Sequence, residues 1–505
     1  MFARAYSATL LGIEGIPVSV EVDIAGGLPC IEIIGLGDAS VRESKHRVRS
    51  AIRNSGYEIP SRRIVVNLAP AGIHKEGSHL DLAVAVGILR ASGSMPPDGP
   101  RSDYVLLGEL GLDGEIRRTP GILPMVLSAL KNGHPRVVAP RANQAEVGWL
   151  EDGELRTASR LEEVVRFLSG AGDLPVAAGT PAEASARERV AVDLADVRGQ
   201  EGAKRALEVA VSGGHNILLI GSPGSGKTLL ARAVPGIMPD LDADESVEVT
   251  AIHSVAGILP PGAGLLRQRP FRAPHHTITP QALVGGGTVP KPGEVTLAHT
   301  GVLFLDEMPH FSRMALDALR QPLEEGVAVV ARSRARVLFP ARCFLVGAAN
   351  PCPCGKFPSA DCTCDERTRR SYLSRLSGPL LDRFDVFVEM PQVTLEDLES
   401  PPGETSAAVR ERVVRARARQ TERFSGRGFL TNSQIPPKDV TKYINLSRDA
   451  RRILHRGFEE LGLSARAYHK ILKVALTVAD LDDSPRIEEA HVAEALAYRD
   501  CFLLS

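Results

Sequence analysis

A glycine-rich loop between an apolar run and a helical pattern constrains this chain more than any other feature. The loop follows the apolar residues of 215–220 and reads G-S-P-G-S-G-K-T. Its glycines let the backbone curl until successive N–H groups point at a polyphosphate; the lysine reaches the β and γ phosphates, and the threonine hydroxyl binds Mg²⁺. The spacing predicts a nucleoside triphosphate site formed by Gly221, Ser222, Pro223, Gly224, Ser225, Gly226, Lys227 and Thr228.

A second apolar run, within 302–307, ends in two adjacent acids. At a strand end, Asp306 is placed to hold Mg²⁺ and Glu307 to orient and deprotonate an attacking water. A strand that simply leaves the core is the alternative, and the phosphate loop upstream favours a hydrolysis site instead. The run 343–348 predicts a third strand lying between the other two, whose polar end residue, Asn350, would hold the water or sense the γ phosphate.

The composition sets the scale and surroundings of this site. With 505 residues, 43% of them hydrophobic, the chain is long enough for two or three domains. Its net charge of −1 does not favour nucleic-acid binding over the whole surface, so any such surface is local. The sequence has no leader pattern and no apolar run of bilayer length, so we expect a cytoplasmic protein with no membrane partner.

Further blocks of sequence resemble a known family. The segment SGPLLDRFD places Arg383 after a helical segment, and Arg466 begins an amphipathic pattern. With the blocks VRGQEGAKRALEVAVSGGHNILLIGSPGSGKT, FRAPHHTITPQALVGGG, PGEVTLAHTGVLFLDE and NPCPCG, the chain resembles the AAA+ ATPases, and among them the magnesium-chelatase-like group that includes the YifB and ComM proteins. The resemblance covers nearly the full chain. Neither an NKxD guanine motif nor an LSGGQ-type signature occurs, so ATP is the expected nucleotide.

The resemblance assigns a role to four residues. It makes Asn350 the first sensor, Arg383 the arginine finger and Arg466 the second sensor, because charge on the γ-phosphoryl oxygens needs cations from several directions. It also places Gln200 beside the adenine. Spacing alone favours surface salt bridges for the two arginines, and a plain helix cap is an equal alternative for Gln200. A finger acting in trans implies a homo-oligomer, and the family implies a hexamer.

Changes in composition divide the chain. Residues 169–186 are rich in small residues and are typical of a linker, and 398–406 form a second polar break. Up to residue 168, the strand-like runs VSVEVDI, CIEIIGL, RIVVNLA and YVLLGEL alternate with helical ones. We expect an α/β multidomain protein with a Lon-protease-like α+β domain at 1–168, a linker at 169–190, an AAA+ P-loop α/β core with inserted hairpins at 191–397, and a C-terminal helical lid at 398–505.

The Lon resemblance of the first domain raises the question of a Ser-Lys peptidase. Alignment of KEGSHLDL with the Lon-like nucleophile block puts His79 at the nucleophile position, and the expected lysine position falls near Leu123. Ser78 lies one position away but has no lysine base to activate it. The domain is therefore expected to be a scaffold for docking, ring assembly or DNA contact. Its first helical run carries a basic face or a solvated one, with Lys45, Arg47, Arg49 and Arg53.

Four of the seven cysteines form two C-x-C pairs that are separated by seven residues. Four thiolates from two short turns suit tetrahedral Zn²⁺ with no open position for catalysis. Free cysteines are the alternative, and an iron–sulfur cluster fits less well. The sequence predicts a structural zinc site formed by Cys352, Cys354, Cys362 and Cys364.

Two segments are candidates for contact with a substrate. Residues 327–339 alternate at strand period around Arg332, Arg334 and Arg336, and they resemble the hairpin that precedes the first sensor in the magnesium-chelatase and replicative-helicase branch. In a ring, such hairpins would hold a phosphate backbone, and a solvated hairpin is the alternative. The arginines of 410–423 surround their helix, and we expect acids within the ring to pair with some of them.

These observations predict a ring-forming, ATP-driven DNA motor that uses ATP, Mg²⁺ and a structural Zn²⁺. Resemblance to the ComM branch implies a helicase that promotes branch migration on single-stranded or branched DNA, in homologous recombination during natural transformation, with recombination proteins as further partners. The alternatives are a magnesium-chelatase-type protein-remodelling ATPase and, with less support, an ATP-dependent peptidase.

Overall fold

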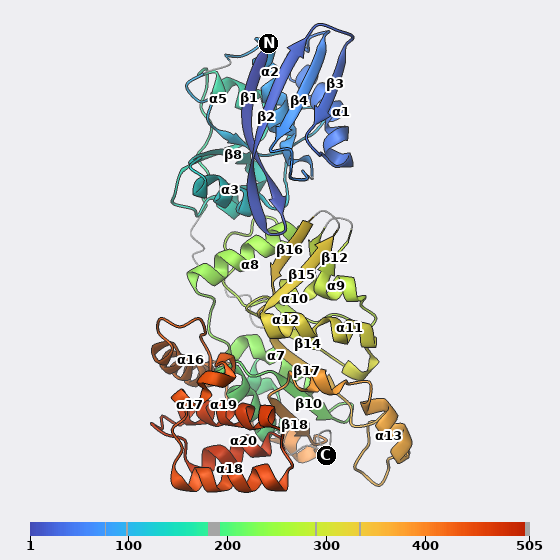
Figure 1. Cartoon of the computed structure of the whole chain (residues 1–505), viewed down its shortest axis with the longest axis vertical. Helices are drawn as coiled ribbons and strands as arrows, with labels where there is room; N and C mark the ends of the chain where they lie inside the picture. The colour runs from blue at the N-terminus through green and yellow to red at the C-terminus, as the bar shows by residue number, and fades with distance from the viewer. Residues whose placement is uncertain (76, 97–98, 180–191, 288–289, 333–334, 500–505) are drawn as a thin grey trace. The chain divides into compact units, whose positions relative to one another are not determined.

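The chain folds into two units, shown in Figure 1. The structure, a computed structural model, describes residues 1–75, 77–96, 99–179, 192–287, 290–332 and 335–499. The first unit is formed by Met1–Ser185 and Ala243–Leu266, and the second by Ala186–Asp242 and Arg267–Ser505. The chain thus leaves the second unit after Asp242, adds a segment to the first, and returns at Arg267.

A mixed seven-stranded sheet is the centre of the first unit. Alternation of buried and exposed residues along the second strand matches a sheet with one covered face. The order is β3-β4-β2-β1-β5-β8-β9; β1, β2 and β4 pair antiparallel, and the other neighbours pair parallel. The strands are β1 (Phe2–Leu11), β2 (Glu14–Ala25), β3 (Cys30–Ile34), β4 (Arg63–Ala69), β5 (Val105–Leu106), β8 (Arg136–Pro140) and β9 (Glu154–Ala158).

One predicted strand of this unit is wrong in its extent. The run YVLLGEL forms two separate short strands, β5 and β6 (Glu109–Leu110), and β6 pairs with β7 (Ile116–Arg117) in a hairpin. The break falls at Gly108, whose φ of 157° suits glycine and whose N–H donates to the His79 carbonyl 2.9 Å away. A tertiary hydrogen bond therefore interrupts the strand that the apolar pattern predicts as continuous.

Helices cover the sheet of the first unit and bury its core. The Asp38 carboxylate accepts from the Val41 N–H at 2.7 Å and caps the first of them. The helices are α1 (Ala39–Asn54), α2 (Asp81–Ala91), α3 (Ile122–Lys131), α4 (Gln144–Val147), α5 (Leu161–Leu168) and α8 (Ala243–Ala256). The last comes from the inserted segment: the Gly121 N–H donates to the Ser254 carbonyl and hydroxyl, each at 3.0 Å, and the Ser254 hydroxyl donates to Glu146.

The second unit is built on a parallel five-stranded sheet. Its three central strands are short, apolar and fully buried, as expected when helices cover both faces. The order is β11-β14-β17-β10-β18, so the strand that ends before Asn350 lies between the other two motif strands, which confirms the prediction. The strands are β10 (Ile217–Gly221), β11 (Phe271–Arg272), β14 (Val302–Leu305), β17 (Phe344–Ala349) and β18 (Val386–Met390).

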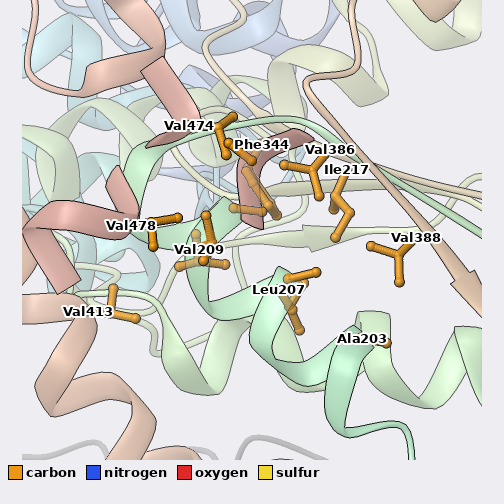
Figure 2. Packing of buried hydrophobic residues seen from close by; sticks show 14 of the residues in the cluster. Ala203, Leu207, Val209, Ile217, Phe344, Val386, Val388, Val413, Val474 and Val478 are labelled. Carbon is orange, nitrogen blue, oxygen red and sulfur yellow. The ribbon is translucent and has the colours of Figure 1, made fainter. Parts of the chain in front are cut away.

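The C-terminal helices share one hydrophobic core with this sheet. Figure 2 shows Phe344 and Val386 of the sheet next to Val474 of the helical region, and Ile217, Val413 and Val478 belong to the same cluster. The helices of this unit include α6 (Glu201–Gly213), α7 (Lys227–Ile237), α13 (Glu366–Leu373), α14 (Gly378–Leu381), α16 (Ser406–Arg423), α17 (Val440–Tyr443), α18 (Arg448–Glu460), α19 (Ala465–Leu481) and α20 (Glu489–Ala497).

Two inserted hairpins complete the second unit and confirm the predicted fold class. One pairs β15 (Val327–Arg332) with β16 (Ala335–Pro340), and the other pairs β12 (Gly285–Gly286) with β13 (Lys291–Pro292). The α/β multidomain fold with a helical C-terminal region agrees with the sequence analysis. Among the described residues, no helix combines the length and the apolar character that a membrane crossing requires.

Candidate functional site

The phosphate loop joins the end of β10 to the start of α7. Gly224 and Gly226 adopt φ values of 82° and 90°, a region that L side chains rarely adopt, which explains the glycines at these positions. The Lys227 ammonium donates to the Gly221 carbonyl at 2.7 Å and to the Ser222 carbonyl at 2.9 Å. Burial lowers the pKa of Lys227, although the charges of Asp306 and Glu307 act in the opposite direction. The lysine side chain thus lies against the carbonyls of its own loop, where helix α7 begins.

The ends of three neighbouring strands bring the predicted polar residues together. Thr228 Oγ1 donates to Asp306 Oδ2 at 2.7 Å, and Lys227 Nζ donates to Asn350 Oδ1 at 3.2 Å. The strands β14 and β17 are parallel neighbours, and β17 also borders β10, so the four residues that follow these strands lie at one carboxyl edge. A hydroxyl and a carboxylate this close are suitable ligands for Mg²⁺ beside a triphosphate.

Glu307 directly follows Asp306 and lies against a histidine. Its φ of 50° is in the left-handed region, and its side chain is 55% exposed. The Nδ1 of His276 lies 3.8 Å from Glu307 Oε2. Both residues line a hollow of about 280 Å³, together with Thr228, Arg232, Ala273, Pro274, His275, Phe304 and Asp306. A carboxylate at the wall of such a hollow suits a general base for a water bound there.

His276 is a site residue that the sequence analysis did not assign. It follows β11, which pairs with β14, the strand that carries the two acids at its end. The histidine pair in FRAPHH was visible in the sequence, but its place depends on this pairing. Arg232, one turn beyond Thr228 on α7, also lines the hollow.

Gln200 contacts the phosphate loop. It adopts a φ of 61° at the N-cap position of α6, but its side chain makes no capping hydrogen bond there. Instead its amide donates to the Ser225 carbonyl at 3.3 Å and to the Pro391 carbonyl at 2.7 Å. The side chain therefore connects the loop to the segment that follows β18.

The two arginines lie at the opposite edge of the sheet. The Arg383 carbonyl accepts from Asn216 Nδ2 at 2.9 Å, and Asn216 directly precedes β10. The phosphate loop begins five residues later, about 16 Å away along a strand. The guanidinium of Arg383 forms an ion pair with Glu324, and the 78% exposed Arg466 lies 3.5 Å from Asp382. Neither side chain contacts the phosphate-loop residues of its own chain within the part that the structure describes.

A buried charge network fixes this edge. Lys470 on α19 forms an ion pair with Asp385 at 3.1 Å, and His215 Nδ1 lies 3.3 Å from the same carboxylate. Burial raises the pKa of Asp385, but the charge of Lys470 and the hydrogen bond with His215 outweigh it, so this pKa lies below its ordinary value. An ionised Asp385 therefore ties α19 to the segment that carries Arg383.

The four cysteines converge as the sequence suggested. Their sulfurs all lie within 4.8 Å of one another, and the Cys352 Sγ is 3.3 Å from Cys354 Sγ and 3.8 Å from Cys362 Sγ. Tetrahedral Zn²⁺ with bonds of about 2.3 Å would set the sulfurs about 3.8 Å apart. Hydrogen bonding from the Lys356 backbone, with smaller contributions from neighbours, lowers the pKa of Cys354 to about 5. The spacing of the four sulfurs fits zinc.

The basic segments differ in how they are paired. In the β15–β16 hairpin, Arg336 is exposed and opposite Ala331, Arg332 ends β15, and Arg334 lies outside the described residues. Four arginines of α16, by contrast, pair with acids of the same chain: Arg410 with Asp240, Arg412 with Glu208 and Glu404, Arg419 with Asp483, and Arg423 with Asp480.

The positions aligned with a Ser-Lys dyad carry other chemistry. The Ser78 hydroxyl donates to the Glu109 carboxylate. His79 is buried, which lowers its pKa to about 4, and Leu123 is buried within α3. Ser78 therefore lacks the lysine base that would activate its hydroxyl as a nucleophile.

Together, the phosphate loop, the acids and Asn350 at one edge of a parallel sheet define a P-loop protein of the AAA+ class. Family models for the magnesium chelatase subunit ChlI match residues 193–398 and 20–143, and one for its C-terminal region matches 403–499. Protein YifB of Escherichia coli (strain K12) is 42% identical over 98% of this chain and 96% of its own length.

Competence protein ComM of Haemophilus influenzae is 41% identical over 98% of this chain and 97% of its own length. Lon protease 2 of Bacillus subtilis is 28% identical over 26% of this chain and 25% of its own length. The chain belongs to the YifB/ComM family of magnesium-chelatase-like proteins. Membership of this family implies ATP and Mg²⁺ as nucleotide and metal.

Proposed function

We propose that this protein hydrolyses ATP and uses the energy to move DNA junctions. The observation that carries the hydrolysis is the contact of Thr228 with Asp306 beside that of Lys227 with Asn350. Lys227 binds the β and γ phosphates, Asn350 orients the attacking water, and Glu307 accepts its proton. Thr228 and Asp306 would hold Mg²⁺, which would supply positive charge beside the phosphoryl oxygens.

The site is shared between neighbouring subunits of a ring. Arg383 and Arg466 lie at the amino edge of the sheet, about 16 Å along β10 from the loop of their own chain. From that edge they serve the γ phosphate bound by a neighbour, where a cation lowers the barrier to phosphoryl transfer. This arrangement makes a closed homo-oligomer, a hexamer by family resemblance, the active form. Gln200 contacts the phosphate loop on the side where the adenine binds.

The substrate is branched DNA. Support comes from the exposed Arg336 on the β15–β16 hairpin and from the near-full-length similarity to a competence protein. The positions of Ser78 and Leu123 carry no Ser-Lys dyad, so they do not support ATP-dependent peptidase activity. Hairpins from all subunits contact the phosphate backbone, and ATP-driven motion of the hairpins advances the strand. We assign to this motor the role of branch migration in recombination of incoming DNA.

The cysteine cluster holds a structural Zn²⁺. The sulfurs approach tetrahedral spacing, and the first pair follows Asn350 by two residues. Four protein ligands leave no position for a substrate, so the metal fixes the exit of the sensor strand and takes no part in hydrolysis.

The test compares ATP hydrolysis by the full-length protein alone, with a four-way DNA junction, with single-stranded DNA and with an unfolded protein. We expect the junction to raise kcat severalfold and the unfolded protein to have no effect. Stimulation by unfolded protein but by no DNA would overturn the DNA assignment in favour of a protein-remodelling ATPase. Loss of all hydrolysis in Lys227→Ala is the control that ties the signal to this site.

A further inference from the structure

Helix α1 of the first unit carries a row of four cations and one histidine on its exposed face. At 3.6 residues per turn, its five members fall within an arc of about 100°. All five are exposed, while the opposite face packs into the core through Val41, Val48 and Ile52. This surface, here called the basic stripe, consists of Arg42, Lys45, His46, Arg49 and Arg53.

The basic stripe differs from three exposed arginines of the same unit that acids neutralise. Arg4, Arg63 and Arg136 form ion pairs with Glu21, Glu32 and Asp103. Within the described residues, by contrast, no carboxylate pairs with a member of the stripe; the Arg42 Nε donates only to the Asp38 backbone carbonyl.

Arg47, on the same helix, points away from the stripe and is paired with Asp81 at 2.8 Å. Glu43 is the one acid within α1, and it lies at the edge of the stripe. An unpaired row of like charges costs free energy through repulsion, and a polyanion relieves this cost.

We propose that the basic stripe binds the phosphate backbone of duplex DNA. Arg42 and Arg53 are eleven residues apart, so the stripe is about 16.5 Å long, which spans about five phosphates of one strand at 3.4 Å each. The exposed face of α1 has no Phe, Tyr or Trp on which a base would stack, and stacking is what single-strand sites use. A straight convex row of cations therefore fits a duplex arm better than a single strand.

This inference rests on the proposed function and extends it: the first unit holds an arm of the junction that the second unit moves. Contacts to phosphates carry no sequence information, so the stripe contributes affinity and positions the DNA but does not recognise its sequence. Each arginine that neutralises a phosphate releases counterions, which makes its contribution measurable through salt.

The experiment measures binding of the full-length protein to a fluorescent 30-base-pair duplex between 50 and 200 mM salt. The stripe variant carries Arg42→Gln, Arg49→Gln and Arg53→Gln. Its matched control carries three equally charge-changing substitutions at ion-paired arginines of the same unit: Arg4→Gln, Arg63→Gln and Arg136→Gln. We expect the stripe variant to reduce the slope of log K against log[salt] by about 2.7, at about 0.9 per phosphate, and the control to leave it unchanged.

The basal ATPase rate of both variants is measured alongside, since neither set touches the nucleotide site. Equal salt slopes for the stripe variant and the wild type would overturn the proposal. An equal reduction of the slope in the control variant would also overturn it. A stripe variant that loses binding to polyglutamate but keeps the duplex slope would overturn it in favour of an acidic protein partner. A wild type that binds no duplex and gains no ATPase rate from any DNA would instead overturn the proposed function itself.

Discussion

Two inactive variants of this protein should restore each other's activity when mixed. The first, Glu307→Gln, lacks the base but keeps its finger; the second, Arg383→Ala, keeps the base but lacks the finger. Alone, we expect the finger variant to lose about 10³-fold or more in kcat. Because Arg383 lies about 16 Å along β10 from the phosphate loop of its own chain, it completes the site of a neighbour.

The size of the recovery follows from how subunits meet. In randomly mixed rings at a 1:1 ratio, half of the loops have a functional base and half of the neighbours supply a finger. About one quarter of the sites are then intact, and independent sites would give about a quarter of the wild-type rate. The assay is steady-state ATP hydrolysis after joint dissociation and reassembly, with the variants assembled separately as the control. A mixed rate equal to the mean of the separate rates would show that Arg383 serves its own chain and would refute the shared site.

Three further predictions follow from local contacts. Replacing Cys354 with serine should reduce bound zinc from one per chain to substoichiometric levels by metal analysis and lower the melting temperature; full retention of metal would contradict the four-cysteine site. His276→Ala should lower kcat by about tenfold at an unchanged KM for ATP, with partial rescue in His276→Asn, because the side chain holds Glu307; an unchanged kcat would dismiss this contact. A fragment of residues 1–179 should aggregate, whereas its fusion to residues 243–266 should be soluble, because Ser254 and its helix complete the unit; equal solubility would contradict this.

The sequence alone was sufficient to predict those site residues that lie close together in the chain. The glycines, lysine and threonine of the phosphate loop lie within eight residues, and the two acids end a recognisable strand, so Lys227, Thr228 and Asp306 were placed without a structure. The spacing of the four cysteines predicted their convergence for the same reason. Asn350 could be placed because a third apolar run preceded it.

What the sequence did not reveal depends on contacts between distant segments. The position of His276 beside Glu307 follows from the pairing of β11 with β14. The assignment of α8 to the first unit depends on hydrogen bonds of Ser254 to Gly121, which are 133 residues apart in the chain. The break in the YVLLGEL run similarly results from a tertiary hydrogen bond at Gly108. Hydrophobic periodicity carries no signal for any of these.

The central claim is that ATP hydrolysis at Glu307 moves DNA junctions. Its most direct test follows a fluorescent four-way junction with homologous arms, incubated with ATP and either the wild type or Glu307→Gln. The wild type should convert the junction into duplex products in proportion to ATP hydrolysed, and the variant should bind the junction but leave it intact. Junction movement by the variant at the wild-type rate, or hydrolysis by the wild type with no movement, would contradict the account.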